Sequence, residues 1–184
     1  MKLISLLEKL EYTCLQGSTD QEVKNVIYDS RKVEEGSLFI CIRGAVVDGH
    51  KFVPDVVAKG AKVLIVEEAV EAPEDVTVIL VKDTRYAMAF ISAAYFGYPA
   101  EKLKVIGITG TKGKTTTTYM VKSILEEVGI RVGLIGTIEA IIGDKSIPAN
   151  NTTPESYTIQ KYFAEMVEAG CECVVMEVSS QGLK

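Results

Sequence analysis

The second half of the chain opens with the segment KVIGITGTKGKTTT, residues 104–117, which carries its strongest structural signal. Its first part, 104–109, is an apolar run typical of a strand, and a helix-compatible run starts at Lys114 and continues to residue 128. Gly110 and Gly113 lie between them, where backbone N–H groups can approach an anion because no side chain blocks the way. The start of the helix adds unpaired N–H groups and the positive end of its dipole. We therefore predict a phosphate-binding loop between a strand and a helix.

Two side chains beside this loop fit a nucleoside triphosphate. Lys114 can reach the β- and γ-phosphates, and the Thr115 hydroxyl can bind Mg²⁺. The loop departs from the pattern G-x-x-x-x-G-K-[ST], because Ile108 occupies the place of the first glycine and Gly107 comes one place early. A competing interpretation is a glycine-rich turn with incidental lysines, and Lys112 fits a solvated loop lysine at least equally well. The order of strand, loop, Lys-Thr and helix favours the triphosphate site.

The rest of the second half alternates strands and helices. Its apolar runs predict strands at 131–135 and 172–178, a helix at 155–169, and a hairpin that joins 138–142 to 146–147. Such alternation predicts a mostly parallel sheet. Doubly wound nucleotide domains normally run well past about 100 residues. Because residues 100–184 are fewer than that, we expect only the first part of such a domain.

The first half repeats this alternation in shorter elements. We expect helices at 3–10, 51–59 and 84–96, and strands at 26–28, 37–42, 62–66 and 76–81. The break Gly97-Tyr98-Pro99 is the predicted domain boundary. The predicted fold class is therefore α/β, with a small mixed α/β domain over residues 1–99 followed by the first part of a P-loop parallel-sheet domain over residues 100–184.

Composition excludes several classes of protein. The 184 residues include 20 Lys and Arg against 25 Asp and Glu, which gives a formal charge of −5. Such a chain has no basic footprint for nucleic acid or an anionic membrane surface, so a bound phosphate must be held locally. No apolar run approaches the roughly 20 residues of a membrane span, and charges interrupt the N-terminus too early for a secretory signal. We expect a cytoplasmic chain with reduced cysteines.

Four groups of segments together resemble the Mur ligase superfamily of amide ligases, and within it the MurE branch. They are GITGTKGKTTT at 107–117, YDSRKVEEGSLF at 28–39 with IRG at 42–44 and DGH at 48–50, NTTPE at 151–155, and VMEVSS at 175–180. The first segment marks the superfamily, whose loop usually has Asn where Lys112 stands. The N-T-T-P and M-E-V-S-S segments are more specific to the MurE branch. The resemblance covers essentially the whole chain.

The resemblance implies an ATP-dependent ligase of peptidoglycan precursor synthesis that uses Mg²⁺. ATP phosphorylates the D-glutamate carboxylate of UDP-N-acetylmuramoyl-L-alanyl-D-glutamate, and the amine of a diamino acid attacks the acyl phosphate. The diamino acid is either meso-diaminopimelate or L-lysine, and the sequence does not decide between them. Residues 1–99 would form the uridine-nucleotide domain and residues 100–184 part of the ATP-binding domain. We expect a monomer.

Site residues carry over by position in these motifs. Lys114 and Glu177 would be catalytic, and Thr115 and Glu177 would be Mg²⁺ ligands. ATP would be held by the loop residues Gly110, Thr111, Lys112, Gly113, Lys114, Thr115 and Thr116. The uridine part would contact Tyr28 and Ser30, and the muramoyl-peptide would contact Asn151, Thr152, Thr153 and Ser179.

Plainer interpretations compete for several of these residues. Glu177 also fits a solvated carboxylate at a strand end, and Ser30 a turn residue after a strand. Thr152 and Thr153 also fit an N-cap for the helix after Pro154, a role that is compatible with substrate contact. His50 fits a surface-loop histidine about as well as a ligand contact.

The chain departs from the family in two respects. Gln181 stands where the family often has His, and glutamine can position a group by hydrogen bonding but cannot titrate near neutral pH. The family's carbamylated lysine and amino-acid-binding domain have no counterpart within 184 residues. We therefore expect an N-terminal portion of the enzyme that does not catalyse ligation alone. The alternatives are another amide ligase of the superfamily and a non-catalytic nucleotide-binding module; a P-loop kinase or GTPase would carry the missing glycine.

Overall fold

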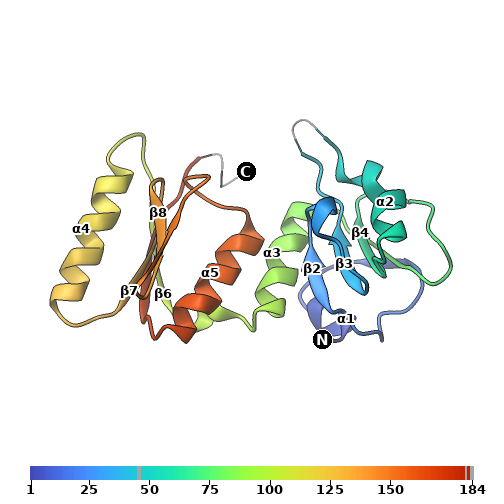
Figure 1. Cartoon of the computed structure of the whole chain (residues 1–184), viewed down its shortest axis with the longest axis horizontal. Helices are drawn as coiled ribbons and strands as arrows, with labels where there is room; N and C mark the ends of the chain where they lie inside the picture. Colours follow the sequence, from blue (N-terminus) through green and yellow to red (C-terminus); the bar gives the residue numbers. More distant parts are fainter. Residues whose placement is uncertain (45–46, 181, 183–184) are drawn as a thin grey trace. The chain divides into compact units, whose positions relative to one another are not determined.

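The computed structural model describes residues 1–44, 47–180 and 182. Contacts divide the chain into two compact units, unit 1 over Met1–Tyr95 and unit 2 over Phe96–Lys184 (Figure 1). The division comes just before the predicted break Gly97-Tyr98-Pro99, where Tyr98 adopts a left-handed conformation with φ 53°. Each unit contains one five-stranded sheet with helices, so the α/β fold class is confirmed.

Unit 1 is built on a sheet in the order β1-β5-β4-β3-β2. The strands β2, β3, β4 and β5 run parallel, and β1 joins antiparallel to β5. The strands are β1 (Thr13–Gln16), β2 (Asn25–Ile27), β3 (Ser37–Ile40), β4 (Val63–Val66) and β5 (Thr77–Leu80). The helices are α1 (Leu3–Leu6), η1 (Ser30–Lys32), η2 (Gly49–Phe52), α2 (Val53–Ala58) and α3 (Thr84–Tyr95).

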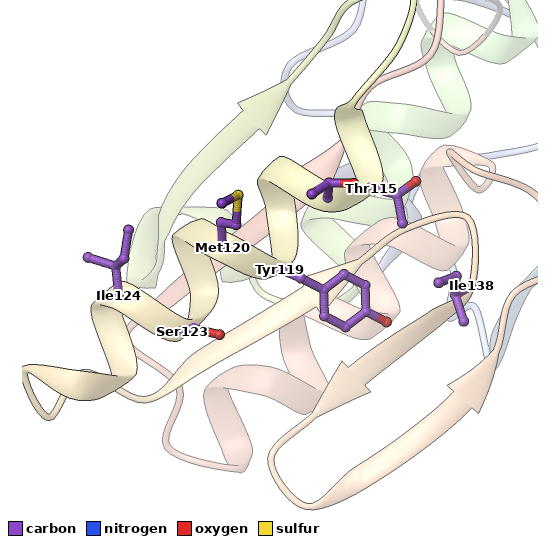
Figure 2. A pocket seen from close by; sticks show the side chains of 7 residues that line it. Thr115, Tyr119, Met120, Ser123, Ile124 and Ile138 are labelled. Atoms are coloured by element: carbon purple, nitrogen blue, oxygen red, sulfur yellow. The ribbon is translucent and has the colours of Figure 1, made fainter.

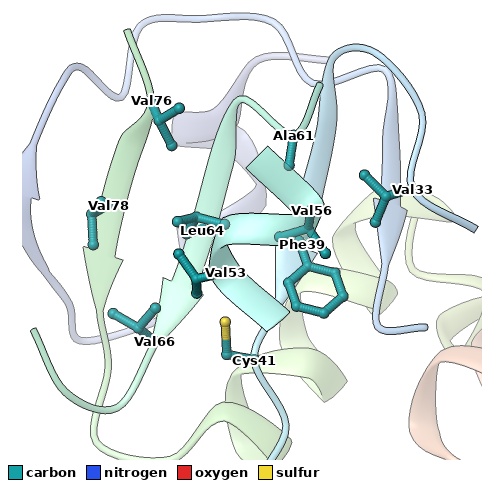
Figure 3. Close-up of a cluster of buried hydrophobic side chains, with 10 residues drawn as sticks. All are labelled: Val33, Phe39, Cys41, Val53, Val56, Ala61, Leu64, Val66, Val76 and Val78. Atoms are coloured by element: carbon teal, nitrogen blue, oxygen red, sulfur yellow. The ribbon is translucent and has the colours of Figure 1, made fainter. Parts of the chain in front are cut away.

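The core of unit 1 lies on both faces of this sheet. All four residues of β3 and of β4 are buried, as expected for parallel strands that are covered on both sides. Figure 3 shows one cluster, in which Phe39 and Leu64 meet Val53 and Val56 of α2. Cys41 belongs to this cluster, and its burial raises the pKa of the thiol to about 12. This cysteine is therefore a small buried apolar residue, as its apolar run predicts.

Unit 2 has a sheet in the order β6-β10-β7-β8-β9. The strands β6, β10 and β7 are parallel, and β8 and β9 continue the sheet as an antiparallel hairpin. The strands are β6 (Lys104–Ile108), β7 (Val132–Ile135), β8 (Glu139–Ile142), β9 (Lys145–Pro148) and β10 (Cys173–Glu177). The helices are η3 (Pro99–Lys102), α4 (Lys114–Glu127) and α5 (Ser156–Glu168).

The helices α4 and α5 cover opposite faces of this sheet (Figure 1). Phe163 and Met166 of α5 pack with Val174 and Met176, whereas Val121 and Leu125 of α4 pack against the cluster on the other face. The central strand β10 is buried along its whole length. Its last residue, Glu177, lies at the carboxyl edge of the parallel strands, opposite the last residue of β6. Among the described residues, no helix combines the length and the apolar character needed to cross a membrane.

Several expected elements differ from the structure. The first helix ends at Leu6 rather than at residue 10. Strand β1 was not expected, because its residues are mostly exposed and lack the alternation that marks a half-buried strand. In unit 2, β6, β10 and β7 are parallel as expected and the predicted hairpin forms β8 and β9; together with the antiparallel β1 of unit 1, this makes both sheets mixed.

Candidate functional site

The predicted phosphate loop connects β6 to the N-terminus of α4. Gly110 and Gly113 have φ values of 145° and 79°, which side-chain-bearing residues rarely adopt, and Gly113 is the N-cap of the helix. Residues 109–113 are exposed, so the loop is open to a ligand. The ammonium group of Lys114 donates to the Gly110 carbonyl at 2.9 Å, across the loop. The arrangement therefore combines open backbone, a helix N-terminus and a lysine, which together suit a phosphate chain.

Glu177 lies beside this loop, at the carboxyl end of β10. Its side chain is fully buried, so the interpretation as a solvated strand-end carboxylate is wrong. The Thr115 hydroxyl, in the first turn of α4, donates to Oε2 of Glu177 at 3.0 Å. The structure thus brings together the two predicted metal ligands, which are 62 positions apart in the sequence.

Thr137 is a further member of this site that the sequence analysis missed. Its backbone N–H donates to Oε1 of Glu177 at 2.8 Å, and its hydroxyl contacts Oε2 at 3.0 Å. The neighbouring Gly136 is buried, and a Cβ atom there would lie 2.6 Å from Oε1. A signal was available, because Thr137 follows the buried strand β7 and the carboxyl ends of parallel strands share one edge of the sheet.

The predicted substrate segment approaches Glu177 from the other side. The hydroxyl of Thr153 donates to the Glu177 carbonyl at 3.0 Å and accepts the Ser179 N–H at 2.9 Å. The hydroxyl of Thr152 shares a hydrogen bond of 3.1 Å with that of Thr137, and Asn151 is exposed. The N-cap of α5 is Glu155, so the N-cap interpretation of the two threonines is wrong.

A pocket of about 580 Å³ extends from the threonines in the first turn of α4 along this helix (Figure 2). Figure 2 shows Tyr119 reaching from α4 toward the chain segment that carries Ile138. The Tyr119 hydroxyl donates to the Glu139 carboxylate at 2.6 Å, and Ser146 donates to its other oxygen. Burial, followed by the bond to Glu139, raises the pKa of Tyr119 to about 12. At neutral pH Tyr119 therefore stays a donor that ties β8 to α4. The pocket is lined by Thr115, Thr116, Tyr119, Met120, Ser123, Ile124 and Ile138.

The predicted uridine contacts lie in unit 1, after strand β2. Tyr28 and Ser30 are half-buried, and Ser30 opens the helix η1. The Ser30 carbonyl accepts a hydrogen bond from Lys59 at 3.0 Å, so its turn position is combined with a tertiary contact. Asp29 caps η1 by accepting the Arg31 N–H at 3.1 Å. The hydroxyl of Ser30 therefore belongs to a well-defined turn at the carboxyl end of β2.

His50 is not a surface-loop histidine. It is 8% exposed, its Nδ1 lies 2.6 Å from the Asp48 carboxylate, and its Nε2 accepts the Glu67 N–H at 3.0 Å. Hydrogen bonds from the His50 backbone and ring lower the pKa of Asp48. Both ring nitrogens are therefore used within unit 1. Gln181, the other departure noted in the sequence, lies outside the described residues.

The donor set at Glu177 fits Mg²⁺. Within the described part of the chain, no group of three or more His, Cys, Asp or Glu side chains is placed to hold a metal ion. Thr115 and Glu177 supply one hydroxyl and one carboxylate, which are hard oxygen ligands. Magnesium is usually bound by one or two carboxylates together with substrate phosphates and water, rather than by an all-protein cage. The set therefore suits a magnesium ion that arrives with a phosphate ligand.

Comparison with known families gives matches over both units. A model of the Mur ligase middle domain matches residues 108–184, which include the phosphate loop and Glu177. A model described as the catalytic domain of the Mur ligase family matches residues 22–96. The two matches together span the predicted site residues of unit 1 and unit 2.

Individual relatives give the same result. A protein from Clostridium perfringens named UDP-N-acetylmuramoyl-L-alanyl-D-glutamate–2,6-diaminopimelate ligase is 53% identical over all 184 residues, and the chain spans 38% of its length. A solved MurF from Acinetobacter baumannii is 28% identical with a TM-score of 0.68, over 97% of this chain and 36% of that one. A solved structure of a ligase with the same name as the Clostridium protein has a TM-score of 0.79 at 23% identity, over 100% of this chain and 37% of that one, which shows the shared fold.

Proposed function

We propose, from the premise that this chain belongs to the Mur ligase family, that it carries the ATP and uridine-nucleotide sites of an amide ligase of peptidoglycan precursor synthesis. The substrates would be ATP, UDP-N-acetylmuramoyl-L-alanyl-D-glutamate and a diamino acid. Of the two diamino acids that the sequence leaves open, 2,6-diaminopimelate is favoured, because it stands in the name of the Clostridium perfringens relative. The chain spans 38% of the length of the Clostridium perfringens relative, so the complete reaction remains a proposal.

The observation that carries the proposal is the contact between Thr115 and Glu177 beside an open glycine loop. A structural carboxylate is normally paired with a cationic side chain or left in solvent, and Glu177 is neither solvated nor paired with a basic side chain of the described residues. A buried carboxylate held by neutral donors next to a phosphate loop is suited to a metal that accompanies a triphosphate.

The chemistry assigns a role to each part of this site. The terminal phosphoryl group would pass from ATP to the D-glutamate carboxylate, with ADP as the leaving group. Amine attack on the resulting acyl phosphate would then form the amide and release phosphate. Lys114 and the loop N–H groups would orient the triphosphate and offset its charge, which is the main requirement of phosphoryl transfer. Magnesium, held by Thr115 and Glu177, would neutralise charge on phosphate oxygens.

The remaining predicted residues would bind the acceptor substrate. Thr152 and Thr153 adjoin the Glu177 strand end through hydrogen bonds, and Ser179 follows it, so this segment would place the carboxylate to be phosphorylated. In unit 1, Tyr28 and Ser30 would contact the uridine part at the carboxyl end of β2, where ligands commonly bind to open α/β sheets.

Calorimetric titration of the chain tests both sites separately. Mg²⁺-ATP should bind saturably, and Lys114→Ala should weaken it by at least about ten-fold, since a charged contact to phosphate is lost. Lys102→Ala, at an exposed lysine of η3, is the matched control. The UDP-dipeptide should bind saturably, and Ser30→Ala or Thr152→Ala should weaken it, whereas Ser5→Ala at an exposed serine of α1 should not.

The outcomes separate the alternatives. Binding of ATP without the UDP-dipeptide would favour another amide ligase of the family. Binding of the UDP-dipeptide with ATP affinity that does not depend on Lys114 would contradict the phosphate-loop assignment.

A further inference from the structure

Among the described residues, three hydrogen-bond donors contact the Glu177 carboxylate, and two of them come from one residue. The backbone N–H of Thr137 donates to Oε1 at 2.8 Å and its hydroxyl contacts Oε2 at 3.0 Å, while Thr115 supplies the third donor, to Oε2. A single residue that bonds to both oxygens fixes the rotation of the carboxylate as well as its position. Thr137 therefore controls the direction in which Glu177 faces.

The backbone beside Thr137 closes the carboxylate in from one side. Gly136 is buried, and any Cβ there would lie 2.6 Å from Oε1 of Glu177, so the absence of a side chain is what admits this oxygen. Glu177 itself is fully buried. Such a carboxylate has to be hydrogen-bonded to offset the loss of water, and the Gly136-Thr137 turn supplies most of that compensation.

The donor count defines where a cation can approach. A carboxylate offers about four lone-pair positions. Here Oε2 receives the hydroxyls of Thr115 and Thr137, and Oε1 receives the Thr137 N–H. Among the bonds of the described residues, one position on Oε1 remains for a metal ion. Rotation of the carboxylate would change which lone pair is open, and the two bonds from Thr137 oppose that rotation.

Thr137 also reaches the segment predicted to bind the acceptor substrate. Its hydroxyl lies 3.1 Å from the Thr152 hydroxyl. Because Thr137 is itself exposed, this contact is within reach of a ligand. A change at Thr152 can therefore be transmitted to Glu177 through one intervening hydroxyl.

We propose that Thr137 is a positioning residue that holds the Glu177 carboxylate in the orientation needed to bind a divalent cation with ATP. The inference rests on the proposed function, since it concerns the metal that accompanies ATP. Thr137 acts through Glu177 and is not itself a ligand of the cation.

The test compares ATP affinity in excess Mg²⁺ with ATP affinity in EDTA, measured on the 184-residue chain. The ratio of the two affinities isolates the contribution of the cation. Thr137→Val removes the hydroxyl at nearly constant volume and should lower this ratio roughly ten-fold, as expected for one hydrogen bond to a charged group. Thr137→Ser keeps the hydroxyl and should restore the ratio. Thr13→Val, at an exposed threonine of β1 in unit 1, is the matched control.

The readings distinguish this inference from the proposed function. A wild-type chain that binds ATP neither in excess Mg²⁺ nor in EDTA contradicts the ATP site and, with it, the inference. A wild-type chain that binds ATP equally with and without Mg²⁺ overturns the inference and the predicted Mg²⁺ ligands but leaves the ATP site intact. A Thr137→Val chain that keeps the wild-type ratio overturns the inference alone. Thermal unfolding of each variant shows whether the fold is intact; loss of the ratio in a folded Thr137→Val chain, with recovery in Thr137→Ser, supports the inference.

Discussion

Each unit places a glutamate at the carboxyl end of a parallel strand, and the two glutamates are held in different ways. Glu67 follows β4 in unit 1 and its side chain is 17% exposed. Its Oε1 accepts the Thr84 N–H at 2.8 Å and hydroxyl at 2.7 Å, and its Oε2 lies 3.4 Å from the Arg43 guanidinium. Glu177 ends β10 in unit 2, is fully buried, and is held by neutral hydroxyl and amide donors.

The difference separates a structural carboxylate from one suited to a ligand. In unit 1 the charge of Glu67 is compensated by Arg43, and its oxygens fix the start of α3. In unit 2, Glu177 forms no ion pair with the described residues, so its charge is left for a cation that arrives with a ligand. Burying a charge without an opposite charge beside it costs stability, and such sites persist where function requires them.

The largest effect is expected for Glu177→Gln. The amide keeps the size of the side chain and can still hydrogen-bond, but it removes the charge that a cation requires. We expect the Mg²⁺-dependent gain in ATP affinity to be lost, by at least about ten-fold, with ATP affinity in EDTA little changed. Thermal unfolding should show an unchanged or higher Tm, because the variant no longer buries a charge that has no opposite charge beside it. Calorimetry and thermal unfolding together measure both quantities.

Glu172→Gln, at an exposed glutamate just before β10, is the control for this change. If Glu177→Gln lowered the Tm strongly and left the Mg²⁺ dependence intact, Glu177 would be structural like Glu67, and the comparison between the units would fail.

Glu67→Gln should give the opposite pattern, with a smaller effect. It breaks the ion pair with Arg43 and weakens the cap on Thr84, so we expect a loss of about 1–3 kcal/mol in the free energy of unfolding and no change in the response of ATP binding to Mg²⁺. Urea unfolding measures the loss. Glu68→Gln offers a matched control, since Glu68 also pairs with Arg43, at 2.6 Å, but is 57% exposed. Equal losses from the two changes would show that burial does not distinguish them.

The sequence was sufficient for the elements with strong local signals. Apolar runs marked every parallel strand, and the glycines and Lys114 marked the phosphate loop, because these features depend on neighbouring residues. Strand β1 escaped prediction because its pairing with β5 joins residues more than sixty positions apart and leaves its side chains mostly exposed. The N-cap interpretation of Thr153 failed for a related reason, since its hydroxyl bonds to the distant strand β10 instead.

The site itself was predicted in part. Thr115 and Glu177 were paired through a family resemblance, and the structure supplies the contact that the resemblance implied. Thr137 was missed because its position just after a predicted strand places it at the sheet edge but does not distinguish it from other strand-end residues. Its contact with Glu177 follows only from the pairing of β7 with β10. The burial of His50 was not evident for the same reason: Asp48 is a local partner, but the Glu67 N–H that its Nε2 accepts follows β4, 17 positions along the chain.

The smallest effect concerns a third carboxylate, Asp29, which is compensated like Glu67 but lies nearer the surface. It caps η1 and pairs with Arg31 at 2.8 Å, and its side chain is 22% exposed. The side-chain hydrogen bond from Arg31 lowers the pKa of Asp29 to about 2, against the opposing effect of partial burial. A carboxyl with a depressed pKa in the folded state stabilises the fold above its unfolded pKa and loses that contribution as the pH falls.

Asp29→Asn should therefore cost stability at pH 6 and progressively less as the pH falls from about 4 toward about 2. Urea unfolding of the wild-type and variant chains at pH 6 and at pH 3 measures the two differences. The wild-type chain should approach the variant in acid because protonated Asp29 can no longer pair with Arg31. A cost that stayed constant with pH would mean that the charge of Asp29 does not account for it. No cost at either pH would mean that the cap on η1, which an asparagine oxygen can also provide, accounts for the whole contribution. In either case Asp29 would no longer serve as a second example of the compensation by charge that Arg43 gives to Glu67.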